Sequence, residues 1–160
     1  MALQIVSARN GFLLYPDGKV DTQLANKTRI LVIDDDLDTL DATRLTLESR
    51  GYEVATTANP EDGLRGIEKD RPDLVILDVM MPDGIEGFQW LWNVRRHPDE
   101  AVRTVPVIVA SSIHKTTPLR FHEGDSDETG SYLPVQGFFD KPVDPDQLVE
   151  RIEKVLSESK

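Results

Sequence analysis

Four short segments of the chain share one pattern, an apolar run rich in β-branched residues that ends abruptly at a polar group. These segments are residues 30–36, 74–78, 107–112 and 138–142. Apolar runs of this length between turn signals are typical of strands that are buried on both faces of a parallel sheet. A further strand pattern covers residues 53–57. The chain is therefore predicted to form a sheet whose strands end at polar side chains.

Helix patterns separate the strands, and residues 29–160 alternate strand and helix as a parallel βα-repeat does. Strands are expected at 29–33, 53–57, 73–77, 105–110 and 137–140, and helices at about 38–50, 60–69, 88–95 and 145–156. The first helix is expected to be capped by Asp38 and to make apolar contacts through Leu40, Leu45 and Leu47. The predicted fold class is α/β, with a five-stranded parallel sheet.

Two of the predicted helices contain glycines or tryptophans whose effect on the helix can be predicted. Gly63 and Gly66 should weaken the helix at 60–69 by about 1 kcal/mol each relative to alanine. Trp90 and Trp92 lie in the helix that follows the third strand. For these two residues we expect one side chain to pack in the core and the other to be half-exposed.

Two regions do not follow the repeat. Residues 1–28 form an N-terminal extension in which residues 12–15 and 19–22 flank the turn sequence Pro16-Asp17-Gly18, so this part is either a small hairpin or disordered. Residues 113–136 fall where the fourth helix is expected, but they contain two prolines, two glycines and an acidic run. Such residues break helices, so an atypical loop with at most a short helix is predicted there.

Composition narrows the classes of protein that need to be considered. The 160 residues include no cysteine, which excludes disulfides and thiolate chemistry. No apolar stretch reaches the roughly 20 residues that span a bilayer, and residues 1–10 do not resemble a signal peptide. The net charge of −11 argues against direct binding of nucleic acid. We expect a cytoplasmic protein without a membrane partner.

The polar ends of the strands carry the candidate chemistry. Because the carboxyl ends of parallel strands line one edge of a sheet, where ligands bind, the pattern brings Asp34, Asp35, Asp78, Ser111 and Lys141 together. Clustered carboxylates repel one another unless a cation lies among them. Oxygen ligands of this kind suit Mg²⁺. The strand ends therefore predict a divalent-metal and phosphoryl site.

Each of these side chains has a chemical role that its type permits. Asp34 and Asp35 can supply one direct and one water-mediated metal contact, and Asp78 can be both a metal ligand and a nucleophile, since a carboxylate can accept a phosphoryl group covalently. Lys141 offers a mobile positive charge for the phosphate. Ser111 offers a hydroxyl donor for another phosphoryl oxygen.

Over residues 28–157 the chain resembles the receiver domain of two-component response regulators. Residues 30–36 resemble the acidic first-strand motif of that family, residues 78–82 its phosphoacceptor loop, residues 109–112 its hydroxyl switch strand and residues 140–142 its lysine–proline pair. The resemblance implies a (βα)5 flavodoxin-like fold at 29–160 and a stand-alone signalling module rather than a dedicated enzyme.

The resemblance also implies roles for particular residues and partners. It implies Mg²⁺-dependent phosphorylation of Asp78 by a sensor histidine kinase or a phosphotransfer protein, followed by intrinsic autophosphatase activity and altered contacts with an unknown downstream protein. Met80 is implied to lend its backbone carbonyl to the metal, Phe138 to be the aromatic switch residue that responds to Ser111, and the Lys141–Pro142 peptide to be cis.

Two departures from the family pattern leave alternatives open. Gly87 lies one position later than the family usually places it, and Lys141 follows Ser111 by 30 positions, which is more than the family usually needs. A pseudo-receiver that is never phosphorylated and binds its partner constitutively is therefore one alternative. A haloacid-dehalogenase-type phosphatase is another, although Met80 stands where that family requires its second acid.

Overall fold

The computed structural model describes residues 13–14, 20–21, 27–80, 86–112 and 135–159. Its main sheet contains the strands β3 (Arg29–Ile33), β4 (Glu53–Thr57), β5 (Leu74–Leu77), β6 (Val107–Ser111) and β7 (Gly137–Asp140). The helices are α2 (Leu37–Ser49), α3 (Pro60–Asp70), α4 (Glu86–Arg95), α5 (Glu100–Arg103) and α7 (Pro145–Glu158). The predicted α/β class with five parallel strands is confirmed.

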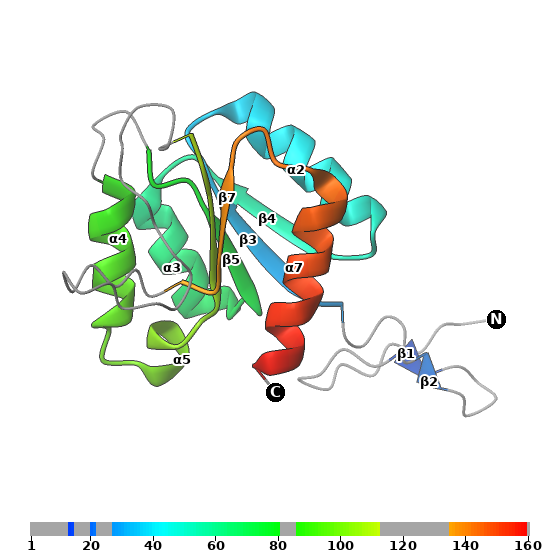
Figure 1. The fold of residues 1–160 in the computed structure, drawn as a ribbon. Helices are drawn as coiled ribbons and strands as arrows, with labels where there is room; N and C mark the ends of the chain where they lie inside the picture. The colour runs from blue at the N-terminus through cyan, green and yellow to red at the C-terminus, as the bar shows by residue number, and fades with distance from the viewer. Residues whose placement is uncertain (1–12, 15–19, 22–26, 81–85, 113–134, 160) are drawn as a thin grey trace.

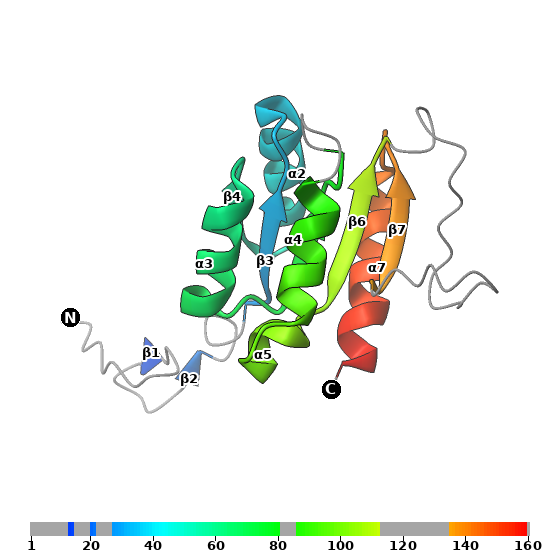
Figure 2. The ribbon, with the colours of Figure 1, turned by 90° about the vertical axis from the view of Figure 1, so that its left-hand side faces the viewer.

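The five strands are all parallel and lie in the order β4-β3-β5-β6-β7. Helices α2 and α7 cover one face of this sheet, and α3, α4 and α5 cover the other (Figures 1 and 2). The three central strands are apolar apart from Arg29 at the start of β3 and Ser111 at the end of β6, because helices cover both faces of the sheet. The doubly covered sheet is the frame that positions the polar strand ends.

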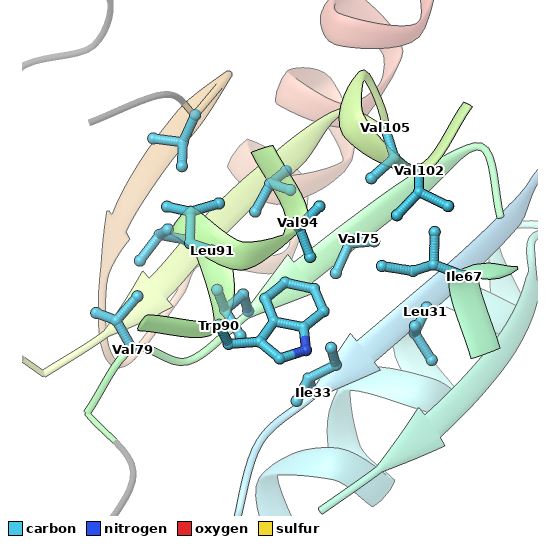
Figure 3. Close-up of a cluster of buried hydrophobic side chains, with 14 residues drawn as sticks. Leu31, Ile33, Ile67, Val75, Val79, Trp90, Leu91, Val94, Val102 and Val105 are labelled. Atoms are coloured by element: carbon cyan, nitrogen blue, oxygen red, sulfur yellow. The ribbon is translucent and has the colours of Figure 1, made fainter. Parts of the chain in front are cut away.

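Each face of the sheet has its own hydrophobic core. On the face of α3, α4 and α5, the core includes Ile67, Val75, Trp90 and Leu91 (Figure 3). On the face of α2 and α7, it includes Leu47, Ile76, Ile108 and Ile152. The alternation of side chains along the central strands sends neighbouring residues such as Val75 and Ile76 to opposite cores.

The predicted elements are largely found, with small shifts at their ends. Strand β7 has the predicted bounds, while β6 starts two residues later than expected and ends one residue later, on Ser111 itself. Helix α3 begins at Pro60 after the cap Asn59, and α7 extends two residues past the predicted end. The four-residue helix α5, which is capped by Asp99, was not predicted.

Two expectations about the first helix are wrong. The N-cap of α2 is Asp36 rather than Asp38, because the Asp36 carboxylate accepts hydrogen bonds from the backbone N–H groups of Asp38 and Thr39. Leu45 is 64% exposed and does not face the core, whereas Leu40 and Leu47 are buried. The apolar stripe of this helix is therefore narrower than its leucine content suggests.

The tryptophans follow the expectation that one packs and one is half-exposed. Trp90 is buried, and its indole N–H donates to the backbone oxygen of Pro60 at 2.6 Å. Trp92 is 40% exposed. Helix α4 therefore presents one tryptophan to the core and the other to solvent.

Two predicted irregular regions lie largely outside the described residues. In the N-terminal part, the two-residue strands β1 (Leu13–Leu14) and β2 (Val20–Asp21) pair antiparallel. The loop expected in place of the fourth helix falls on residues 113–134, which are not described. In the described part, no helix is long and apolar enough to cross a membrane.

Candidate phosphoacceptor site

The carboxyl ends of β3, β5, β6 and β7 bring the predicted polar residues to one edge of the sheet. Asp34 directly follows β3 and Asp78 directly follows β5, and the Asp78 N–H donates to the backbone oxygen of Ile33 at 2.9 Å. Ser111 is the last residue of β6. Lys141 follows β7, and its N–H donates to the Ser111 backbone oxygen at 2.9 Å. Parallel pairing thus places residues from four strand ends side by side.

The carboxylate of Asp78 is the meeting point of three hydrogen-bond donors. Its Oδ1 accepts from the Ser111 hydroxyl at 2.9 Å and from the Met80 backbone N–H at 2.8 Å. Its Oδ2 accepts from the Lys141 ammonium at 2.9 Å. Asp78 is only 6% exposed and Ser111 is fully buried. Both carboxylate oxygens are therefore held in fixed directions, away from most of the solvent.

Lys141 links this carboxylate to a second one. Its ammonium also donates to Asp34 Oδ2 at 2.5 Å, while Asp34 Oδ1 accepts from the Asp36 N–H at 2.9 Å. Asp34 is 3% exposed, and burial raises its pKa above the usual range despite these hydrogen bonds. Burial alone would lower the pKa of Lys141, but the hydrogen bonds and charges of Asp34 and Asp78 outweigh it and raise that pKa.

The acidic cluster has the ligand chemistry of a divalent-metal site. One carboxylate oxygen from each of Asp34, Asp35 and Asp78 can be chosen so that all lie within 4.8 Å of one another. Lys141 supplies a single positive charge to two buried carboxylates, so a further cation is electrostatically favoured. Hard oxygen ligands and room for water on the exposed Asp35 side suit Mg²⁺. The residues present therefore fit this ion.

The three consecutive aspartates after β3 have different positions. Asp34 is buried within the cluster, Asp35 is exposed at its rim, and Asp36 turns away to cap α2. The hydrogen bonds from the hydroxyl and backbone of Thr39 are the main reason that the pKa of Asp36 lies below its usual value. The three aspartates therefore supply two candidate metal ligands, Asp34 and Asp35, and the N-cap of α2, Asp36.

The remaining predicted site residues lie close to this edge. Met80 contributes its N–H to Asp78, and its side chain is half-buried against the core on the α4 side. Phe138 is half-buried against the same core. Because Val109 pairs with Phe138, and side chains two positions apart share a face, Ser111 and Phe138 lie on the same face of the sheet. The Lys141–Pro142 peptide is cis, as the resemblance implied.

A cavity beside the cluster was not predicted. It has a volume of about 440 Å³ and is lined by Asp34, Asp78 and Lys141, by Thr39 and Thr43 of α2, and by Leu148 of α7, among others. Small side chains on α2 leave this space open. Its lining comes from the sheet, two helices and the loop after β7, so no local sequence signal could have indicated it.

Comparison with known proteins agrees with the geometry. Residues 30–153 match the family model of the response regulator receiver domain. The transcriptional regulatory protein CseB from Streptomyces coelicolor is 38% identical over 138 residues, which are 83% of this chain and 51% of CseB. The chain therefore spans about half the length of this relative.

Solved structures show the same fold. A putative response regulator from Chloroflexus aurantiacus superposes with a TM-score of 0.63 at 31% identity, and the match covers 82% of this chain and 99% of that one. The chemotaxis response regulator CheY4 of Vibrio cholerae gives a TM-score of 0.64 at 26% identity, with 81% and 99% covered. The flavodoxin-like arrangement expected from the sequence is confirmed by these structures.

Proposed function

Because this chain belongs to the response regulator receiver domain family, we propose that Asp78 accepts a phosphoryl group from a sensor histidine kinase or a phosphotransfer protein. The observation that carries the proposal is the convergence of Ser111, Lys141 and the Met80 N–H on one buried carboxylate. A signalling module of this family is not a dedicated enzyme, and the haloacid-dehalogenase alternative finds no support in the family match.

The proposed reaction is a displacement at phosphorus. An oxygen of Asp78 attacks the phosphorus of a phosphohistidine, so that an O–P bond forms while the N–P bond breaks and its electron pair stays on the imidazole. Lys141, which already bridges Asp34 and Asp78, follows the negative charge onto the phosphoryl oxygens. The Ser111 hydroxyl, which donates to the Asp78 carboxylate before the reaction, then donates to another phosphoryl oxygen.

Mg²⁺ is part of the proposal, with Asp34, Asp35, Asp78 and the backbone carbonyl of Met80 as its protein ligands. When bound, the ion would neutralise charge on the transferring phosphoryl group. The protein residues hold the carboxylate of Asp78 in a fixed direction for attack, because both of its oxygens are already oriented by donors.

The proposed output is a change in protein contacts. When the Ser111 hydroxyl turns toward the phosphoryl group, Phe138 on the same face of the sheet moves into the space that is vacated, and the surface around β7 changes. Hydrolysis of the acyl phosphate then resets the protein, which is its autophosphatase activity. The downstream partner is proposed to be a protein rather than nucleic acid, and the predicted cytoplasmic location is part of the same proposal.

The test is intact-mass spectrometry after incubation with acetyl phosphate and Mg²⁺. Wild type should gain a single phosphoryl group, and the gain should disappear with chelator and in Asp78→Asn. Asp70→Asn, which changes an exposed aspartate of α3, is the matched control and should be labelled normally. If a known receiver is labelled under these conditions but this chain is not, a constitutive pseudo-receiver replaces the proposal.

A further inference from the structure

The outer face of α4 carries an exposed aromatic and a cation in contact. Trp92 is 40% exposed, and the guanidinium of Arg96 lies 5.9 Å from the centre of its ring. None of the described carboxylates forms an ion pair with Arg96, although the chain as a whole has a net charge of −11. Tryptophan and arginine are the residues most enriched at the energetic centres of protein interfaces.

The surface around this pair is hollowed rather than flat. A groove of about 480 Å³ lies between α3 and α4, lined by Leu64 and Glu86 among others. A second hollow of about 390 Å³ is lined by Gln89, Trp92, Asn93 and Arg96. Gln89 and Asn93 border both, so α4 offers a continuous, indented face.

The order of side chains on this face is self-complementary. Four polar residues are spaced three, four and three positions apart and therefore form one stripe along the helix: Glu86, Gln89, Asn93 and Arg96. If a second copy of α4 lies antiparallel across a twofold axis between positions 89 and 93, Glu86 of each copy meets Arg96 of the other. Gln89 then meets Asn93, and both Trp92 side chains lie beside the axis.

We propose that α4 is a self-association surface and that its occupant is a second copy of this chain, in an antiparallel, twofold-symmetric pair. The argument is charge complementarity, because one face holds the acid and the base at the two positions that twofold symmetry brings together. The ten-residue helix is about 15 Å long, so the contact is small. The association should be weak, concentration-dependent and weakened by salt.

The test is sedimentation of the full chain over a dilution series, with charge reversals at the two paired positions. Arg96→Glu and Glu86→Arg should each raise the dimer dissociation constant by about tenfold or more, since symmetry applies each like-charge clash twice. The double variant, Arg96→Glu with Glu86→Arg, should restore dimerisation. Lys154→Glu, which makes the same kind of charge change as Arg96→Glu at an exposed position of α7, should leave the constant unchanged.

Tryptophan fluorescence provides a second measurement. Trp92 should become less accessible to acrylamide as concentration rises, while buried Trp90 gives a constant background. Trp92→Ala should abolish the dimer in sedimentation. A chain that sediments as a monomer throughout, or a double charge reversal that fails to restore the dimer, would overturn the proposal. The measurements use the unphosphorylated chain, so their outcome is independent of the chemistry at Asp78.

Discussion

Gly87 lies directly against the backbone of Val79. A β-carbon on residue 87 would come within 2.8 Å of the carbonyl oxygens of Asp78 and Val79, and closer still to the Val79 Cα. These are backbone atoms of the segment that carries the proposed phosphoacceptor, so they cannot move aside as the end of a side chain can. The first turn of α4 is thus packed onto the phosphoacceptor segment.

Gly87→Ala should therefore destabilise the protein and disturb the site. We expect the free energy of unfolding to fall by about 1–3 kcal/mol, the usual effect of overpacking, and phosphorylation by acetyl phosphate to slow. Urea unfolding and the initial rate of the mass gain measure the two effects. Gly66→Ala is the matched control, because its new carbon would lie an ordinary 3.6 Å from the Leu31 side chain. That substitution should be neutral or stabilising by up to about 1 kcal/mol.

The glycines of α3 show what sequence patterns cannot reveal. Gly63 was expected only to weaken its helix, but a β-carbon there would lie 2.5 Å from the Ile33 Cδ1, so glycine permits α3 to approach β3 closely. Helix propensity depends on a residue's own backbone conformation. The advantage of glycine at residue 63 comes instead from Ile33 in β3, which lies 30 positions earlier. The need for glycine is visible only once the layers are packed.

The strand ends, by contrast, could be predicted well. Asp34, Asp78, Ser111 and Lys141 are brought together as expected, because parallel pairing fixes where each strand ends relative to its neighbours. The cavity beside them and the short helix α5 were missed, since both depend on which side chains are small or capped in three dimensions. The apolar pattern of a buried strand can be read from neighbouring residues, whereas the shape of a cavity depends on residues that are distant in the sequence.

The position of the first helix cap can be tested by a pair of alanine substitutions. Asp36→Ala should lower the free energy of unfolding by about 1 kcal/mol, because it removes the acceptor of the Asp38 and Thr39 N–H groups. Asp38→Ala, at the position that the sequence favoured, should cost less, since it loses only a favourable charge in the first turn. Equal losses in urea unfolding would contradict the assignment of Asp36 as the cap.

Lys141 should stabilise the metal-free protein as well as serve the proposed chemistry. Lys141→Met keeps the aliphatic stem but leaves the buried carboxylates of Asp34 and Asp78 without their shared cation. We expect a loss of about 2 kcal/mol in chelator, below the 3–5 kcal/mol typical of fully buried pairs because the lysine side chain is 19% exposed. Adding Asp34→Asn to this variant should recover part of the loss, since it removes the repulsion. A double variant no more stable than Lys141→Met would contradict this explanation.

Asp99 links two helices on the other side of the protein through a charged contact. Its Oδ2 accepts from Arg71 at 2.6 Å, and its Oδ1 caps α5 by accepting from the Ala101 N–H. The hydrogen bond from Arg71 is the main reason that the pKa of Asp99 lies below its ordinary value of 3.8. Glu68 adds a further negative charge near Arg71, and the Asp99 N–H donates to a ring nitrogen of His97.

A carboxyl whose pKa is lowered by folding stabilises the native state above its unfolded pKa, and that contribution is lost as the pH falls through the folded value. Asp99→Asn keeps a capping oxygen but removes the charge, so wild type should be more stable than this variant at neutral pH. The difference should shrink as the pH falls below the ordinary aspartate value of 3.8.

Urea unfolding at a series of pH values measures this difference in stability, and carbon NMR titration of Asp99 should show its pKa rising in Arg71→Gln. A stability difference that is unchanged by acid, together with an Asp99 pKa that does not respond to Arg71→Gln, would show that the contact is not electrostatic.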